Sequence, residues 1–192
     1  MRRAGLAVLI ILAVAGCGGR SASVSADHLG RLVLQRADLS KAFTAFANGP
    51  QVALDNSGTP RADPTRFGRE GGWIARYRRG ATRRTAGPLI VESRVDVFKS
   101  SEGARADLAA YRAMFAAQPG GTPHAIAAPA VGDAALATTF EQAGAFPVTY
   151  YRVAWRFRNA TASVTVEGWR GRIHAADAYV LARKQQSRLA RG

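Results

Sequence analysis

The clearest strand signal in the chain is the stretch Tyr151-Arg152-Val153-Ala154-Trp155-Arg156-Phe157, in which apolar and charged side chains alternate. Successive side chains of a strand point to opposite faces, so this spacing separates the aromatic residues from the arginines. The apolar face carries Tyr151, Val153, Trp155 and Phe157. The stretch therefore predicts a half-buried strand, with these aromatic rings in the core; the alternative is that they line a ligand pocket together with Trp73.

Further strands are expected on both sides of this stretch. Arg158-Asn159 suits a tight turn, because Asn tolerates a positive φ, and residues 162–167 then alternate Ala or Val with Ser, Thr or Glu. Residues 136–140 alternate in the same way, and turn residues at 143–147 allow the chain to reverse. These segments predict an antiparallel meander of three strands.

An earlier hairpin is predicted from residues 73–79 and 89–98, which alternate with the same period of two. The connection Gly80–Pro88 is polar and short enough for a hairpin. Its pairing brings charged side chains of the two strands together on one exposed face. These residues are Arg76 and Arg78 on the first strand and Glu92, Arg94 and Asp96 on the second.

Two helices are predicted from apolar side chains that recur with helical spacing. The first begins after Ser100 or Ser101, which suit an N-cap, and ends near Gln118. Its apolar stripe consists of Ala104, Leu108, Tyr111 and Phe115. The second runs from about His174 to Leu189, with cations near its C-terminal end that complement the helix dipole.

Together these elements predict the α+β class: an antiparallel sheet of about five or more strands with two helices packed on it, in the order ββαβββα. Because each strand has one polar face, we expect both helices to cover the same face of the sheet. Residues 29–46 form an ordered piece that fits helix or strand equally. From Asn48 to Gly72 the chain is polar and rich in Gly and Pro, which predicts a long loop that is either mobile or a binding edge.

The N-terminus has the pattern of an export signal. Arg2 and Arg3 precede an apolar run over residues 4–15, which is too short to span a membrane, and small residues follow it. The sequence Val14-Ala15-Gly16-Cys17 resembles the lipobox of bacterial lipoproteins. The resemblance implies that residues 1–16 are a signal peptide and that Cys17 is lipidated, which places the protein on the outer face of the bacterial cell membrane. The alternative is a plain secretory signal, in which Cys17 has no role.

The expected organisation follows from this start. Residues 17–27 comprise the lipidated cysteine and a flexible tether, and residues 28–192 form a single α+β domain. Cys17 is the only cysteine, so no disulfide within the chain can stabilise this domain.

Four fragments of the expected domain also resemble a group of small exported bacterial proteins with a PsbP-like fold. The fragments are the run from Leu32 through Ala37-Asp38-Leu39, Val95-Asp96-Val97-Phe98-Lys99-Ser100, Val131-Gly132-Asp133-Ala134-Ala135 and the paired strands around Arg156-Phe157-Arg158-Asn159. The resemblance covers most of residues 29–190. It implies an α+β fold and assigns no role to any residue.

The charge of the chain is strongly basic, with 27 Lys and Arg against 13 Asp and Glu. Export makes nucleic acid an improbable partner, and the chain has no zinc-ligand set, RNP-like motif or dense Lys/Arg run. The remaining partners are the membrane through its lipid anchor, an anionic lipid or envelope polymer, and an unidentified protein. The basic face expected to attract an anion consists of Arg76, Arg78, Arg94, Arg152 and Arg156. The alternative is that the arginine excess reflects composition alone.

No catalytic, cofactor-binding or metal-binding residues are predicted. His28, His124 and His174 are far apart and lack a second ligand at helical spacing, and the chain has no nucleophile elbow, dinucleotide or phosphate-loop motif. Glu92 and Asp96 share a predicted strand face, but Arg94 between them favours salt bridges over acid–base catalysis. The sequence therefore predicts a non-catalytic lipoprotein that binds a ligand or partner at the envelope. The alternatives are an enzyme acting on envelope material and a purely structural surface lipoprotein.

Overall fold

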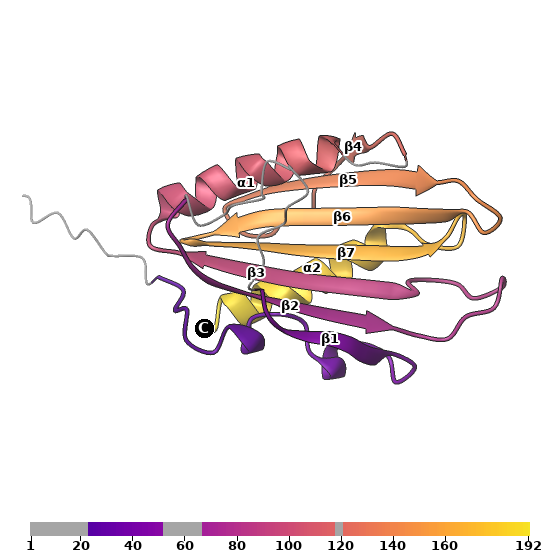
Figure 1. Ribbon diagram of the computed structural model, residues 1–192, viewed down its shortest axis with the longest axis horizontal. Coiled ribbons are helices and arrows are strands. Elements are labelled where there is room, and N and C mark those ends of the chain that lie inside the picture. Colours follow the sequence, from indigo (N-terminus) through magenta and orange to yellow (C-terminus); the bar gives the residue numbers. More distant parts are fainter. Residues whose placement is uncertain (1–22, 52–66, 118–120) are drawn as a thin grey trace, which may run out of the picture.

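The structure is a computed structural model that describes residues 23–51, 67–117 and 121–192 (Figure 1). The export signal, Cys17 and the first part of the expected tether lie outside these ranges. So do residues 52–66 of the expected loop and residues 118–120 at the predicted end of the first helix.

One antiparallel sheet of seven strands forms the centre of the fold, in the spatial order β1-β2-β3-β7-β6-β5-β4. The strands are β1 (Thr44–Pro50), β2 (Arg69–Arg78), β3 (Ile90–Phe98), β4 (His124–Ile126), β5 (Ala134–Gln142), β6 (Val148–Phe157) and β7 (Ala160–Trp169). The helices are α1 (Ser101–Ala116) and α2 (Ala175–Leu189), and two short 3-10 turns, η1 (Leu29–Arg31) and η2 (Arg36–Asp38), precede β1. The α+β class is confirmed, whereas the order is βββαββββα and contains two strands that the predicted order lacks.

The additional strands β1 and β4 form the two edges of the sheet. The side chains of β1 are mostly exposed, and the strand ends at Pro50, which an edge strand tolerates because one side of it needs no hydrogen-bond donor. Residues 48–50 and 69–72, which we expected at the ends of a long loop, belong to β1 and β2. Residues 48–50 pair with residues 73–75 of β2, and residues 69–72 pair with β3. The loop prediction is therefore wrong at both ends, and its centre lies outside the described residues.

The main core lies between the sheet and α2. Trp155 is fully buried there, and its indole nitrogen donates to Gln186 Oε1 at 2.7 Å. Ser93 of β3 donates to Gln185 Oε1 at 2.8 Å, which fixes the helix against the strand below it. Tyr151, Phe157 and Trp73 are half-buried and pack against this core, so the prediction that these rings are core residues is confirmed for Trp155 and in part for the others. Tyr151 also lines a hollow at the β4 side of the sheet. The bounds of α2 agree with the predicted helix from about His174 to Leu189. Its buried apolar residues, Ala178, Leu181, Ala182 and Leu189, lie at helical spacing.

The helix α1 lies on the opposite face of the sheet from α2 (Figure 1), and the expectation that both helices cover one face is wrong. The face beneath α1 carries small hydroxyl side chains on β7. The Asp107 carboxylate accepts from Thr161 Oγ1 at 2.5 Å, and the Tyr111 hydroxyl lies 3.1 Å from Ser163 Oγ. Because these polar groups find partners on α1, this strand face can be buried without an apolar surface.

The turn between β6 and β7 is present as predicted, but the residue with positive φ is Arg158, at 55°. Asn159 instead uses its side-chain amide to hold three backbone groups. Its Oδ1 accepts from the Val24 nitrogen at 2.7 Å, and its Nδ2 donates to the carbonyls of Val24 and Phe98 at 3.1 and 2.8 Å. Val24 lies within the stretch expected to be flexible tether, yet it is buried in the main core.

Candidate functional site

The helix α1 covers only part of its face of the sheet, and beside it lies a hollow of about 320 Å³ that we call the α1 hollow. Its sheet side is formed by Arg76, Glu92, Arg94, Tyr150, Arg152 and Glu167, and its helix side by Tyr111, Met114 and Phe115. The hollow therefore has charged groups on the strands and apolar groups on the helix. This combination is typical of sites that bind a small ligand with one polar end.

Strand register brings the charged side chains together from four strands that neighbour each other. Glu92 of β3 is opposite Arg76 of β2 on one side and Thr165 of β7 on the other, and Thr165 is in turn opposite Arg152 of β6. Arg94 follows Glu92 two residues later on the same face. The sequence residues are far apart, and only the antiparallel pairing makes them neighbours.

Glu92 is held by two arginines. Arg76 Nε and Arg94 Nε each donate to one of its carboxylate oxygens at 2.6 Å. Burial alone would raise the pKa of Glu92, but the charges and hydrogen bonds of Arg94 and Arg76 hold this pKa below its usual range. Glu92 is therefore ionised at neutral pH, and its charge is already used by two partners.

Arg152 has a different environment. Its guanidinium lies 4.5 Å from the ring centre of Phe140, 5.4 Å from that of Phe115 and 5.9 Å from that of Tyr150, within reach of cation–π attraction. It makes no salt bridge and no hydrogen bond with any residue that the structure describes. Burial lowers its pKa to about 10, against the field of Glu92, which raises it. Arg152 is therefore charged at neutral pH, and its donors have no acceptor among the described residues.

Tyr150 and Glu167 also line the hollow, and they are opposite each other on β6 and β7. Burial, with the nearby charge of Glu167, raises the pKa of Tyr150 to about 12. Burial also raises the pKa of Glu167 above its usual range, although its hydrogen bond with Tyr150 acts in the opposite direction. Glu167 thus gives up its proton less readily than Glu92, and the hollow carries more positive than negative charge.

The predicted basic face is confirmed in part. Arg76, Arg94, Arg152 and Arg156 do lie on one face of the sheet, but they are not a uniform solvated surface. Arg156 is bound to Asp133 at 3.1 Å, so the expectation that its charge is left available is wrong. The partner was missed because Asp133 precedes the neighbouring strand β5 and is remote from Arg156 along the chain.

The remaining charged residues of the predicted face, Asp96 and Arg78, contact partners outside the hollow. Asp96 is fully buried and accepts from Arg69 Nε at 2.5 Å, so Glu92 and Asp96 do not act together. Arg78 is exposed at the end of β2, where it lies over the Phe46 ring at 5.6 Å. The only site residue assigned from sequence, Cys17, lies outside the described residues.

The histidines are only partly brought together. His124 and His174 line one hollow at the β4 side of the sheet, whereas His28 lines another. Within residues 23–51, 67–117 and 121–192, no group of three or more His, Cys, Asp or Glu side chains is placed to hold a metal ion.

Sequence reasoning missed Tyr150, Glu167 and Phe140 as parts of a site. A usable signal was present, because Phe140 and Tyr150 occupy the same strand faces as Thr138 and Arg152. Aromatic rings beside an arginine on a strand face indicate that this face is covered, although the arginine alone suggests an exposed surface. The two rings stack with centres 4.3 Å apart and planes 4° from parallel.

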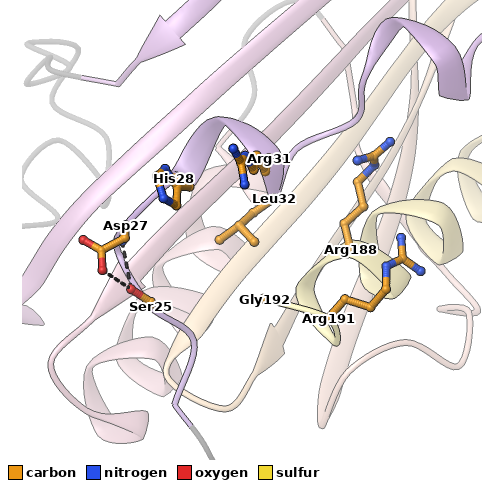
Figure 2. A pocket seen from close by; sticks show the side chains of 8 residues that line it. All are labelled: Ser25, Asp27, His28, Arg31, Leu32, Arg188, Arg191 and Gly192. Carbon is orange, nitrogen blue, oxygen red and sulfur yellow. Dashed lines mark hydrogen bonds between the residues drawn. The ribbon is translucent and has the colours of Figure 1, made fainter.

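The hollow that His28 lines has a volume of about 460 Å³ and lies where the described chain begins and where α2 ends (Figure 2). We call it the tether hollow; its main lining residues are Ser25, Asp27, Arg31, Leu32, Arg188 and Arg191. Figure 2 shows Ser25 and Asp27 on one side and the two arginines of the α2 terminus on the other. The Ser25 hydroxyl donates to the Asp27 carboxylate at 3.0 Å.

Comparison with known proteins supports the fold. No protein-family model matches the chain, and no curated protein matches its sequence. A solved structure, the extracellular domain of PknH from Mycobacterium tuberculosis, matches with a TM-score of 0.67 at 13% identity, over 89% of this chain and 99% of that one. In the part of the chain that the structure describes, no helix is long and apolar enough to cross a membrane. At this level of identity, the chain shares with the PknH extracellular domain its fold.

Proposed function

We propose that this chain is an exported lipoprotein, anchored through Cys17 to the outer face of the bacterial cell membrane, whose non-catalytic domain binds an anionic ligand in the α1 hollow. The charged start, short apolar run and lipobox-like Val14-Ala15-Gly16-Cys17 support export and lipidation. The fold shared with an extracellular domain is consistent with a position outside the cytoplasm.

The observation that carries the binding proposal is the environment of Arg152. A guanidinium that is largely removed from water loses hydration, and this loss is normally offset by a carboxylate or by hydrogen-bond acceptors. Arg76 and Arg94 have such a partner in Glu92, whereas Arg152 has aromatic rings. A bound anion would supply the acceptors that Arg152 lacks.

The lining of the hollow also indicates the kind of anion. Arg152 can hold a carboxylate or phosphate with two parallel hydrogen bonds, whereas the Tyr150 hydroxyl already donates to Gln142 Oε1 at 3.2 Å. Met114 and Phe115 on α1 offer an apolar wall opposite the charged strands. The ligand class is therefore a small amphiphilic anion, with a carboxylate or phosphate attached to an apolar body.

Titration of the full-length protein in neutral detergent with phenyl phosphate tests this proposal. The Nε–Hε signal of Arg152, observed by NMR and assigned through the variant Arg152→Gln, should shift on titration. Benzyl alcohol should leave the signal unchanged, because it has the ring without the charge. Arg152→Gln should weaken phenyl phosphate binding about 10- to 100-fold, which corresponds to loss of a charge-assisted hydrogen-bond pair.

The matched control is Arg105→Gln, which removes the same charge from an exposed position on α1. This variant should bind phenyl phosphate as the parent does. Equal affinity of the parent and the Arg152→Gln variant would contradict the proposal and leave Arg152 with a packing role.

A second candidate, an enzyme acting on envelope material, is favoured by one observation. Glu92 and Glu167 lie on neighbouring strands in the same hollow, and their environments move their pKa values in opposite directions. Such a divergence is found in acid–base pairs. Glu92, however, is engaged by two arginines and is a weak base, so binding without catalysis remains the stronger proposal.

A further inference from the structure

The tether hollow lies at the end of the body from which the chain leads to Cys17. Val24 is fixed there by its two hydrogen bonds to Asn159 and by burial in the main core. The C-terminal end of α2 reaches the same end of the molecule, whereas the connection between β2 and β3 lies at the opposite end (Figure 1). Because Ser23 is six residues from Cys17, the chain between them spans at most about 20 Å.

Arg31 and Arg191 are the two arginines of the tether hollow that are available to a ligand, and His28 lines the hollow beside Arg31. Both arginines are exposed, and neither side chain forms a salt bridge or hydrogen bond within the described ranges. Arg188 is fixed differently, since its Nε donates to the Asp38 carboxylate at 2.8 Å. Figure 2 shows Arg31 above Leu32, with Arg188 and Arg191 extending from the α2 end. Arg31 and Arg191 thus border a polar hollow from two different elements, η1 and the end of α2.

We infer that the tether hollow binds the headgroup phosphate of an anionic membrane phospholipid and so orients the body on the bilayer. The inference rests on the proposed lipid anchor, because the anchor holds the hollow within about 20 Å of the lipid surface. Two guanidinium groups that line one hollow suit a phosphate oxyanion. Within the described ranges Asp27 forms no salt bridge with either arginine, and its carboxylate accepts a hydrogen bond from Ser25 on the other side of the hollow.

Docking at this hollow has a consequence for the rest of the molecule. The β2–β3 connection lies at the opposite end of the sheet (Figure 1), so docking turns that end away from the bilayer. The short chain to Cys17 then limits the distance between the body and the bilayer, and the two arginines determine which surface of the body meets the membrane. Without them the lipid anchor, at one end of the chain, would not select a single orientation of the body.

A single label on the anchored protein can measure this orientation. Lipidation occupies Cys17, the only cysteine of the chain, so a cysteine introduced at Ser187 is unique. Ser187 is exposed on α2 next to Arg188, and its hydroxyl bonds only within its own helix, to the Arg183 carbonyl at 3.0 Å. A fluorophore on Ser187→Cys is reconstituted with the full lipidated chain into nanodiscs that contain a headgroup-attached quencher. A second chain labelled at Ala145→Cys, in the β5–β6 connection, reports the opposite end.

In phosphatidylglycerol discs we expect strong quenching at position 187 and little at position 145. The double variant Arg31→Gln/Arg191→Gln should lower the docking equilibrium, taken from the ratio of quenched to unquenched label, by about tenfold or more, since each basic residue at an anionic surface contributes about fivefold. The control Arg84→Gln/Arg172→Gln removes the same charge from exposed positions near the β2–β3 connection and should dock as the parent does.

Three other outcomes would overturn the inference, and each of them identifies a different cause. Equal quenching in the parent and the Arg31→Gln/Arg191→Gln variant would show that the tether alone sets the orientation. Complete loss of quenching at position 187 on addition of millimolar inorganic phosphate, at constant ionic strength, would show that the hollow prefers free phosphate to the lipid headgroup and would overturn the lipid as its ligand. A chain whose Cys17 carries no lipid by mass spectrometry would overturn the proposed anchor as well, whereas an anchored but undocked body would overturn this inference alone.

Discussion

Replacement of Arg152 by Met should make the protein more stable, although it removes a side chain that is largely buried. Burial lowers the pKa of Arg152 from 12.5 to about 10. One pKa unit corresponds to about 1.4 kcal/mol, so keeping the guanidinium charged in the hollow costs at most about 3 kcal/mol. Met has a similar length, no charge and enough flexibility to fill the space beside Phe115 and Phe140.

Two effects reduce the expected gain. Arg152 remains partly exposed, so water recovers part of the lost hydration. Its three ring contacts also stabilise the charged form by about 0.5 to 1 kcal/mol each. We therefore expect Arg152→Met to raise the free energy of unfolding by about 1 kcal/mol. Because the folded-state pKa of this base is depressed, the cost is present at every pH below about 10 and diminishes only above it.

Urea unfolding at neutral pH of a chain that begins at Ser23 measures this effect. The comparison variant is Arg94→Met, which leaves Glu92 with one arginine fewer and should lower the free energy of unfolding by about 1 to 3 kcal/mol. If Arg152→Met also lowers the free energy of unfolding, by about 1 kcal/mol or more, the contacts of Arg152 stabilise the fold. Burial of Arg152 would then be no reason to expect an anion in the α1 hollow.

Three further outcomes are expected. Trp155→Ala should lower the free energy of unfolding by about 3 to 5 kcal/mol in urea, because it empties the centre of the main core and leaves Gln186 without its donor; a loss below about 1 kcal/mol would contradict the described packing. Glu167→Gln should stabilise the protein at neutral pH and not below about pH 4, since the raised pKa of Glu167 gives stability that is complete below its unfolded value and is lost as pH rises; a gain that is independent of pH would exclude this cause. Mass spectrometry of the N-terminal peptide, after expression in a bacterium, should find a diacylglyceryl thioether on Cys17 and no residues 1–16; an unmodified thiol would refute the anchor.

The five strands that the sequence predicts are those in which apolar side chains alternate with polar or charged ones. The edge strands β1 and β4 have little buried side-chain surface, so their residues show no period of two. What holds β1 in place is backbone pairing with β2, which leaves no trace in the side-chain pattern. Pro50 and Gly49 at its end read as loop residues, yet an edge strand accommodates both.

The placement of the helices shows a second limit of the hydrophobic pattern. Thr161 and Ser163 on β7 read as the outer face of a half-buried strand, yet both are buried beneath α1. The deciding signal was on the helix, where Asp107 and Tyr111 are four residues apart and therefore on one side. A polar residue beside an apolar stripe indicates that the covered surface has polar groups to satisfy.

The sequence predicts the basic face but not the partners of Arg152 and Arg156, because no residue along their own strand indicates them. In a sheet the relevant neighbours lie across strands, where Arg156 meets Asp133 and Arg152 meets Phe140. This difference changes the expected response to salt. Charges on an open surface are screened beyond about 8 Å at physiological ionic strength, so attraction through them fades as salt is added. The charge of Arg152 lies within a hollow with apolar walls, where screening is weaker, and an anion bound there is held by contact and persists at salt concentrations that remove attraction to the open surface.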